Sequence, residues 1–481
     1  MNSIKNLLLK TLKTLKTSET LKTSETELVV RGWLLTKRAQ KEITFININD
    51  GSCPQGLQLV LQSTLFDNLV DFTIGCSLEA TGKIVETYKS LSNTSPAKIP
   101  LYEMQCSKLV LIGTCDTETY PFAKTKLSLE YLRKFSHIRG RTSTYGSIFR
   151  LRSQIMLEMH KYLGGDEEFL FLNPPIITRG DCEGGGGVFQ LTEKDLSVIL
   201  PAQLNKFDWG QDHFSQPVYL TVSSQLQLEA LACSLGRVYT TNKSFRAEHS
   251  TTHKHLSEFE HLEVEACYVN LSELMDIAEN LIKNIGQNIL NTCGDDIKNL
   301  EKFISPNLSA RLVHITTSKY IRTSYNDAIK LLQGMQINKI IETDIVDGMD
   351  LNSEMESALT THYDAPVFVY DWPFEIKAFY MKRSDTNPTL CKNFDLLMPY
   401  KVGELIGGSI REDSYEKITE VVALRKMNVD PIQYYLDLRK FGSVPHGGFG
   451  LGLDRLVMLM TGMDNVKDVV PFPIQYKSCD Y

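Results

Sequence analysis

The sequence predicts an α+β protein with an N-terminal OB-fold β-barrel and a larger domain whose antiparallel sheet is flanked by helices. Residues 27–113 hold short β-rich runs separated by turn residues such as Asn49-Asp-Gly-Ser52, which is typical of a small barrel. Residues 146–481 mix such runs with amphipathic helical segments, which indicates the second architecture. Residues 114–145 are expected to link the two domains.

Length and composition indicate an ordinary globular protein. With 481 residues, two or three domains are expected. The net charge of −7 means that nucleic-acid binding would depend on local basic regions. Ten scattered cysteines without Cys-x-x-Cys spacing argue against zinc and favour reduced intracellular thiols. No apolar run approaches the roughly 18 residues of a membrane helix, so a soluble, cytoplasmic protein is expected.

Residues 1–26 contain the hexamer Leu-Lys-Thr-Ser-Glu-Thr twice, ending at Thr20 and Thr26. The abundance of Lys, Ser and Thr suits a targeting peptide, but the segment lacks Arg. We therefore favour a solvated helix or a partly disordered lead-in over a targeting segment.

The first strands of the predicted barrel combine basic and aromatic residues. Arg31 and Lys37 lie close to Trp33 and Phe45 in the sequence. Basic groups can neutralise phosphates while aromatic rings stack on bases, so the pattern suits single-stranded nucleic acid. Trp33 and Phe45 fit the core of the barrel equally well, and the pattern alone leaves both interpretations open.

The predicted linker carries a basic run that fits either a solvated face or a surface following a nucleic-acid backbone. The run consists of Lys124, Lys126, Arg133, Lys134, Arg139 and Arg141. The apolar periodicity from Ser147 to Leu163 then predicts one long helix. Residues 271–365 read as mostly amphipathic helix, partly a helical insertion. Strands are expected to resume at 366–370, 376–381 and 402–411.

The segment from Phe245 to Glu265 is rich in side chains that could bind or react with a ligand. Alternation places Arg246 and Glu248 on one face of a strand, and Ser-Thr-Thr residues form a turn before a second alternating run. We expect an antiparallel hairpin that gathers a guanidinium, a carboxylate, imidazoles and an aromatic ring. This inventory suits a nucleoside triphosphate. By spacing alone, a surface hairpin with ion pairs is equally compatible.

Three segments resemble the motifs of class II aminoacyl-tRNA synthetases. Phe171-Leu-Asn-Pro-Pro-Ile-Ile-Thr178 is similar to the end of motif 1, the Phe245–Phe259 stretch to motif 2, and His446-Gly-Gly-Phe-Gly-Leu-Gly-Leu-Asp-Arg455 to motif 3. Together with the barrel, the resemblance covers nearly the whole chain and is strongest to asparaginyl-tRNA synthetases of the bacterial and organellar type. It implies ATP-dependent ligation of L-asparagine to tRNA(Asn) through an asparaginyl-adenylate. It also implies Mg²⁺ and a homodimer formed through motif 1.

The resemblance assigns Arg246 to the α-phosphate, Arg455 to the γ-phosphate and Glu404 to magnesium, and these are the expected catalytic residues. The expected ATP-binding set is Arg246, Glu248, His255, Glu258, Phe259, Glu404, Gly452 and Arg455. Within it, Glu248 would accept the adenine amino group and Phe259 would stack on the ring. Asp395 is the expected second metal ligand, although it precedes Glu404 by nine positions where the family pattern has about eight.

The expected amino-acid-binding set is Glu183, Ser223, Gln225, Glu229 and Arg411. Glu183 and Gln225 occupy the family positions for the α-ammonium group. Where aspartyl enzymes have a lysine for the side-chain carboxylate, this chain has Leu228, followed by Glu229. Glu229 can accept from a carboxamide NH₂ and would repel an aspartate carboxylate, while Arg411 can donate to the carbonyl. These features favour asparagine.

The expected anticodon-binding residues are Arg31, Lys37, Phe45 and Gln58. By resemblance, Phe45 would stack on a base and Gln58 would read the central uridine. Three positions depart from the family pattern: His249 stands where Asn is usual, and Lys254 and Ile474 where Arg is usual. Loss of the planar guanidinium fork at Lys254 is expected to weaken a phosphate or tRNA contact.

Three alternatives remain. An aspartyl-tRNA synthetase, discriminating or not, is disfavoured by Leu228 and Glu229. A synthetase-like asparagine synthetase needs no anticodon domain, and the basic barrel argues against it. A non-enzymatic tRNA-binding regulator is disfavoured because Arg246, Glu404 and Arg455 are all present.

Overall fold

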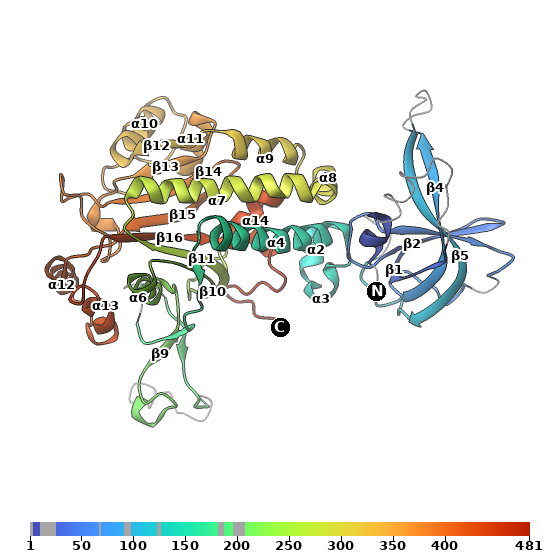
Figure 1. Cartoon of the computed structure of the whole chain (residues 1–481), viewed down its shortest axis with the longest axis horizontal. Helices are drawn as coiled ribbons and strands as arrows, with labels where there is room; N and C mark the ends of the chain where they lie inside the picture. Colours follow the sequence, from blue (N-terminus) through green and yellow to red (C-terminus); the bar gives the residue numbers. More distant parts are fainter. Residues whose placement is uncertain are drawn as a thin grey trace. The chain divides into compact units, whose positions relative to one another are not determined.

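The computed structural model describes residues 3–9, 26–66, 69–90, 98–122, 127–180, 187–195 and 207–481. The chain forms two compact units, Met1–Arg150 with Asp295–Phe303, and Leu151–Gly294 with Ile304–Tyr481. Both are drawn in Figure 1. A short piece of the predicted helical insertion therefore clusters with the first unit.

The first unit contains the predicted barrel. Its strands are β1 (Leu28–Ala39), β2 (Ile43–Asn49), β3 (Leu57–Gln62), β4 (Ser77–Ser90) and β5 (Lys98–Gly113). They close in the order β1-β2-β3-β5-β4, with β3 and β5 parallel and the other pairs antiparallel. Alternate residues such as Leu34 and Ile46 fill the core. The predicted OB-fold barrel is confirmed.

Residues 4–9 are helical and cover part of the barrel core. Ile4 and Leu7 are 1% and 3% exposed, and the Ile4 amide donates to Asp50 Oδ2 at 2.8 Å. The prediction of a solvated lead-in is therefore wrong for these residues, because their apolar side chains are needed to close one end of the barrel. Most of the hexamer repeat lies outside the described residues.

The predicted linker is helical only in its second part, which holds α2 (Leu129–Arg133), α3 (Ser136–Arg139) and the first residues of the long α4 (Ser143–Lys161). Helix α4 continues as a π-helical turn over Tyr162–Asp166. Part of the linker's basic run is used internally. Arg139 is fully buried, 4.4 Å over the Tyr145 ring, and Arg141 lies 4.9 Å over Trp33. Neither predicted role applies to Arg139.

The second unit is built on an eight-stranded sheet with the order β12-β13-β14-β15-β16-β11-β10-β6. Its strands are β6 (Leu170–Phe171), β10 (Arg237–Phe245), β11 (Glu258–Cys267), β12 (Ile321–Ser324), β13 (Val367–Tyr370), β14 (Asn393–Met398), β15 (Gly403–Ile410) and β16 (His446–Gly452). The central strands are antiparallel, as predicted. The edge strands β6 and β12 pair in parallel.

Helices of the second unit pack on this sheet or on one another (Figure 1). They are α6 (Gln225–Leu235), α7 (Leu271–Thr292), α9 (Leu308–Thr317), α10 (Tyr325–Ile337), α11 (Ser353–Tyr363), α12 (Tyr415–Leu424), α13 (Gln433–Asp437) and α14 (Leu453–Thr461). Almost all of α8 (Gly294–Phe303) belongs to the first unit. Helix α7 begins with a reciprocal capping box between Asn270 and Glu273. Within the described ranges, no helix is both long and apolar enough to cross a membrane.

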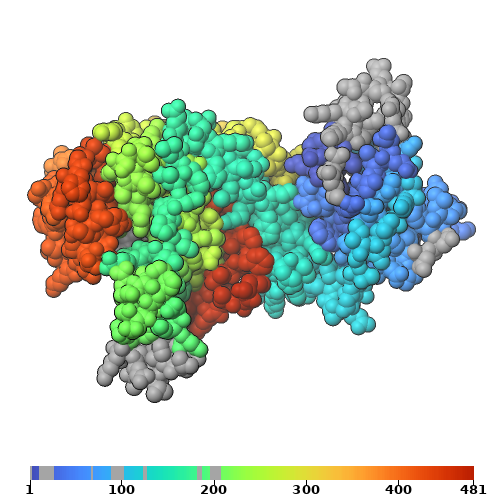
Figure 2. Space-filling view, turned by 60° about the horizontal axis from the view of Figure 1, so that its bottom comes forward, coloured from blue at the N-terminus to red at the C-terminus, as the bar shows by residue number. Residues whose placement is uncertain are grey.

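A separate small sheet, β7 (Ile177–Thr178), β9 (Val218–Leu220) and β8 (Gln190–Leu191), leads into a lobe drawn in light green in Figure 2. The strand predicted at 376–381 is wrong. Residues Phe374–Ile376 form a 3₁₀ turn, and only Met381 makes a bridge, to Arg411. The carbonyls of Phe374 and Lys377 accept from Arg425 instead of a neighbouring strand.

Candidate functional site

Strand β11 forms the floor of the candidate site. Phe259, His261, Glu263 and Glu265 alternate with Leu262 and Val264, which are fully buried in the core. Two pockets lie over the polar face. Phe259 lines the first, which we call the Arg455 pocket. Glu263 and Glu265 line the second, the Arg411 pocket. His261 lines both.

The two pockets adjoin. Besides His261, they share Arg246, Glu404, Gly407 and Gly450. Arg246 follows β10 directly, and its amide donates to the Ser257 carbonyl at 2.9 Å, which closes the predicted hairpin. A ligand group in one pocket can therefore meet a group held in the other, beside a guanidinium.

The Arg455 pocket contains the predicted ATP-binding residues with one exception. Its lining includes Arg246, Glu248, His255, Phe259, Glu404, Gly452 and Arg455. The Arg246 guanidinium lies 5.4 Å over the Phe259 ring. The exception is Glu258, which does not line the pocket and pairs with Lys243 at 3.3 Å.

One end of the Arg455 pocket is rich in cations. Arg455 Nη1 donates to the Glu404 carbonyl at 2.7 Å, and Lys254 and His255 line the wall beside it. Burial lowers the pKa of Lys254. Burial and the neighbouring Arg455 lower the pKa of His255, which keeps its imidazole neutral near pH 7. This arrangement suits a polyanionic group.

Glu356 of α11 is an acidic neighbour that the sequence analysis missed. Burial and the nearby Glu404 raise its pKa to about 7, against the opposing charge of Lys254. An added Cβ at Gly403 would contact the Glu356 carboxylate and Lys254 Nζ, so both groups converge on this residue. Glu356 lies within a segment read as plain amphipathic helix, and no local pattern marked it.

The two predicted metal ligands both reach the site. Glu404 lines both pockets, and Asp395 lines the Arg411 pocket, where it accepts from Lys377 Nζ at 2.7 Å. A β-bulge between Leu396 and Leu397 shifts the register opposite Glu404, which accommodates the longer spacing. Burial raises the pKa of Asp395 to about 6, with Lys377 opposing the shift and Glu404 reinforcing it.

The donor set fits a magnesium ion held mainly by substrate. Among the described residues, no group of three His, Cys, Asp or Glu side chains could enclose a metal ion by itself. Mg²⁺ characteristically uses one or two carboxylates together with phosphate oxygens and water. Glu404 and Asp395 beside a cation-rich pocket match that pattern.

The Arg411 pocket contains three predicted amino-acid-binding residues and several that were missed. Ser223, Gln225 and Arg411 line it, as predicted, whereas Glu183 lies outside the described residues. The missed lining residues include Glu263, Glu265, Lys377 and Tyr380. The alternation along β11 could have identified both glutamates, because it places them on the face that carries Phe259.

Glu263 and Glu265 are held differently. Glu263 accepts from the Ser223 hydroxyl and, at 2.9 Å, from the Ser224 amide. Glu265 pairs with the guanidinium of Arg411. Burial raises the pKa of Glu265 to about 7, opposed by the charge of Arg411 and reinforced by that of Glu229. The pocket thus carries one carboxylate held by hydroxyl and amide donors and one held by a guanidinium.

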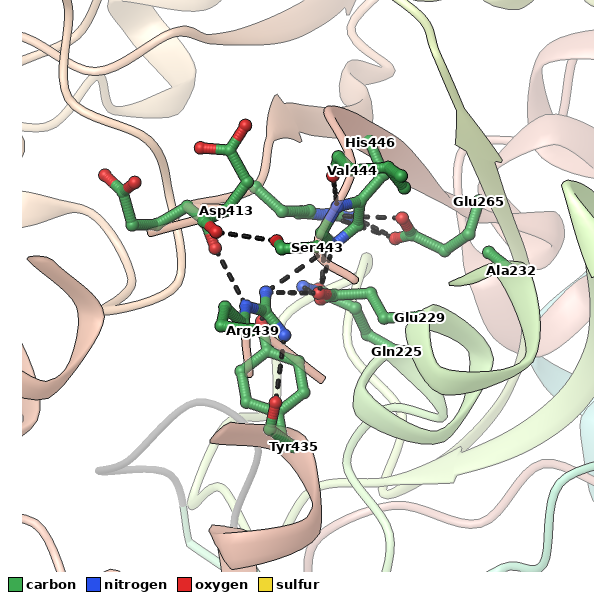
Figure 3. Close-up of polar contacts among 12 residues, drawn as sticks. Gln225, Glu229, Ala232, Glu265, Asp413, Tyr435, Arg439, Ser443, Val444 and His446 are labelled. Carbon is green, nitrogen blue, oxygen red and sulfur yellow. Dashed lines mark hydrogen bonds and ion pairs between the residues drawn. The ribbon is translucent and has the colours of Figure 1, made fainter. Parts of the chain in front are cut away.

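Glu229 does not line the Arg411 pocket. Figure 3 shows it surrounded by Gln225, Arg439 and His446. It is fully buried and accepts from Gln225 Nε2 at 2.9 Å and from Arg439 Nη2 at 2.9 Å. His446 Nε2 lies 3.0 Å from the same carboxylate. Burial alone would raise the pKa of Glu229, but His446 and the arginines hold it below its usual range.

Arg411 also belongs to this polar cluster, whereas Leu228 does not. Arg411 Nε lies 3.8 Å from Glu229 Oε1, so one guanidinium contacts both Glu229 and the pocket-lining Glu265. Leu228 is fully buried in an apolar cluster with Ala232 and Val238. The position that carries a lysine in the aspartyl segment therefore contributes to the core here.

A further pocket lies on the barrel and contains Lys37, Phe45 and Gln58, as predicted, with Arg38. The Arg38 guanidinium lies 5.0 Å over the Phe45 ring, and Gln58 Nε2 donates to Glu103 at 2.6 Å. Neither Phe45 nor Trp33 belongs to the barrel core. Arg31 does not line this pocket and pairs with Glu79 at 2.6 Å.

Two of the unusual positions have structural partners. His249 stacks on Tyr476 with ring centroids 4.6 Å apart. The Ile474 carbonyl accepts from the Ser257 amide at 2.9 Å. The C-terminal segment is therefore fixed against the hairpin by a ring contact and a backbone bond, which do not require an arginine.

Comparisons with known proteins agree with this geometry. Residues 128–476 match the family model described as tRNA synthetases class II (D, K and N). This match defines the class of the protein. The chain is 40% identical over 450 residues to an asparagine–tRNA ligase of Thermosynechococcus vestitus, covering 93% of this chain and 95% of the relative. It is 41% identical over 463 residues to a probable mitochondrial asparagine–tRNA ligase of Dictyostelium discoideum, covering 95% and 94%.

Among solved structures, the chain resembles the asparaginyl-tRNA synthetase of Pyrococcus horikoshii complexed with asparaginyl-adenylate. The TM-score is 0.80 at 29% identity, with 94% of this chain and 96% of that chain covered. The chain belongs to the asparagine–tRNA ligase family of class II tRNA synthetases.

Proposed function

We propose that the protein ligates L-asparagine to tRNA(Asn) in two steps, with ATP consumed in the formation of an asparaginyl-adenylate. The observation that carries this proposal is the common wall of the two pockets, which contains Arg246 and Glu404. A nucleotide in the Arg455 pocket and an amino acid in the Arg411 pocket would place their reacting groups side by side. Family membership supports the same reaction.

In the first step, an oxygen of the asparagine α-carboxylate attacks the α-phosphorus of ATP, and pyrophosphate leaves. Both reactants are anionic, so alignment and charge neutralisation provide most of the rate enhancement. Arg246, at the junction, neutralises the α-phosphate while Phe259 stacks on the adenine. Arg455 and Lys254, at the cation-rich end, bind the outer phosphates. Glu404 and Asp395 would hold Mg²⁺, which supplies further neutralisation of phosphate charge when bound.

Selection of the amino acid occurs in the Arg411 pocket. Glu263, which accepts a hydrogen bond from Ser223, would accept the α-ammonium group. Arg411, which lines the pocket, would donate to the side-chain carbonyl of asparagine. Glu229 acts on the substrate through Gln225 and Arg411, which it orients from behind. An aspartate carboxylate would meet Glu265, with Glu229 close by, and the resulting like-charge contact disfavours it.

Exchange of pyrophosphate into ATP, measured with asparagine and with aspartate, tests this assignment. The wild-type protein should exchange pyrophosphate into ATP when asparagine is present but not when aspartate is present. Arg246→Ala should reduce exchange by about a hundredfold or more, because a donor to developing charge is lost. Arg179→Ala, whose guanidinium pairs with the exposed Asp430 outside both pockets, is the matched control. Exchange with aspartate would instead identify an aspartyl enzyme, and no exchange by folded protein would favour the regulator.

The barrel is proposed to bind the anticodon through Lys37, Phe45 and Gln58, with Phe45 stacking on a base. A homodimer through the motif 1 region and a cytoplasmic location remain proposals. The buried Leu228 weighs against aspartyl specificity, and the barrel pocket weighs against an asparagine synthetase.

A further inference from the structure

The polar face of β11 carries side chains at regular intervals, along which a ligand spanning the two pockets would lie. Phe259, His261, Glu263 and Glu265 occupy alternate positions, so neighbours on this face are about 6.6 Å apart. Phe259 is proposed to stack on adenine, and Glu263 to bind the α-ammonium group. His261 lies midway between them and lines both pockets. It therefore faces the part of an adenylate in which the carbonyl, the phosphate and the ribose meet.

The two ring nitrogens of His261 have different surroundings. Nδ1 lies 3.3 Å from the Ser244 hydroxyl and 3.5 Å from Glu263 Oε1. A carboxylate can only accept, so this side of the ring favours a proton on Nδ1. Nε2 lies against Gly450, where an added Cβ would approach it to 2.6 Å. Gly450 lines both pockets, so the unprotonated nitrogen faces the junction.

We propose that His261 is the general base of the transfer step, accepting the proton of the terminal ribose hydroxyl of tRNA through Nε2. This inference rests on the proposed function and adds a residue to it. Glu263 and Ser244 orient the ring from its Nδ1 side, in the way that a third group orients a catalytic histidine.

The step is balanced without any further reactant. The ribose oxygen forms a bond to the carbonyl carbon of the adenylate, and the bond from that carbon to the phosphate oxygen breaks. AMP leaves with the electron pair, and the hydroxyl proton moves to His261 Nε2 and then to solvent or to the departing phosphate. Adenylate formation involves no hydroxyl proton, so the two steps place different demands on this residue.

The surroundings keep His261 available as a base. Burial lowers its pKa, Arg246 lowers it further and Glu263 raises it. The other charged groups that line the two pockets are Glu248, Lys254, His255, Glu260, Glu265, Lys377, Asp395, Glu404, Arg411, Asp454 and Arg455. A neutral imidazole at pH 7 can accept a proton, and general-base catalysis of this kind contributes about 10²–10⁴-fold.

The test separates the two steps in the full-length protein. His261→Gln is loaded with asparagine, ATP and Mg²⁺, the enzyme-bound adenylate is isolated, and a tRNA(Asn) transcript is added for a single turnover. Transfer should fall by about a hundredfold or more, whereas pyrophosphate exchange should fall by less than about tenfold, since that step needs no base. In the wild type, the transfer rate should decrease as the pH falls through the lowered pKa of His261, and in His261→Gln it should not.

Two further variants make the result decisive. Ser244→Ala, which removes only an orienting contact at Nδ1, should slow transfer by a smaller factor. His314→Gln removes a histidine of α9 that is bonded to Tyr400 and lies outside both pockets, and it should leave both steps unchanged. Equal losses in exchange and transfer for His261→Gln would overturn the proposal, as would wild-type transfer by the variant. Absence of exchange in the wild type would instead overturn the proposed function itself.

Discussion

The buried carboxylate of Glu229, outside the Arg411 pocket, and the carboxylates around Glu404, in the wall that the two pockets share, have opposite electrostatics. Glu229 has Gln225, Arg439 and His446 as partners, and its pKa is held below the usual range despite complete burial. The pKa is raised to about 6 for Asp395 and to about 7 for Glu356. In both cases burial is the main cause, and the neighbouring Glu404 adds to it.

The difference indicates which of these carboxylates have sufficient counter-charge within the chain. The Glu229 cluster contains its own counter-charges, so its geometry is fixed before substrate binds. The carboxylates near Glu404 have too little positive charge around them, and Mg²⁺ would supply what is missing when the nucleotide binds. On the proposed function, the groups that select the amino acid are held in place before substrate binds, whereas the nucleotide and its metal would supply the charge that the other group lacks.

The largest expected effect is on stability. Glu229→Gln removes the charge that compensates the buried Arg439 and His446, so the free energy of unfolding should fall by about 3–5 kcal/mol. Urea unfolding at pH 7 measures this change. Glu420→Gln, on the exposed side of α12, should change it by less than about 0.5 kcal/mol. A stable Glu229→Gln variant would show that the cluster is not held by charge pairing.

In contrast to Glu229→Gln, Glu404→Gln should preserve stability and impair activity. Its carboxylate repels Asp395 and Glu356, so removing the charge should not lower the midpoint of thermal unfolding. Pyrophosphate exchange should fall by about a hundredfold, because the bound metal loses a ligand. A variant that loses stability but keeps exchange would reverse the comparison.

The contributions of Glu356 and Glu229 to stability should depend on pH with opposite signs. A carboxyl whose pKa is raised on folding binds more protons in the folded state, so its contribution to stability decreases as the pH rises. The stability of the wild type relative to Glu356→Gln should therefore fall by about 2 kcal/mol between pH 5 and pH 7. Glu229 contributes in the other direction, and its stabilisation is lost as the pH falls below its unfolded pKa.

Urea unfolding at several pH values checks the Glu356 prediction. Glu354 on the same helix is the control, because hydrogen bonds from Thr343 and from the Glu342 amide lower its pKa and place its titration below this range. Parallel stability curves for the wild type and Glu356→Gln would contradict the predicted role of burial.

The smallest expected effect is on the barrel. Phe45→Ala should raise the KM for tRNA by about tenfold, because one base–aromatic stack is worth about 1–3 kcal/mol, without affecting exchange measured in the absence of tRNA. Arg31→Ala should have a smaller effect, since Arg31 pairs with Glu79 and lies outside the pocket. Aminoacylation at varied tRNA concentration distinguishes the two, and equal effects would remove Phe45 from its proposed role.

Several features could be predicted because their signals are local. The barrel strands, the β10–β11 hairpin and helix α4 follow from periodicity within short windows. Most of the predicted ATP-binding residues line one pocket, because many of them lie in the β10–β11 hairpin. The strand expected at 376–381 failed because packing of Phe374 and Phe379 against the α12–α13 helices overrides its β pattern.

By itself, the sequence determined the order of the motifs, the two architectures and many of the residues that line the Arg455 pocket, since alternation along a strand sets which side chains share a face. Only the tertiary structure decided the electrostatic state of the carboxylates. Glu229 meets Arg439 and His446 across more than 200 residues of chain, and Glu356 approaches Glu404 from a separate helix. Burial and pairing depend on groups remote in sequence, and no local pattern contains that information.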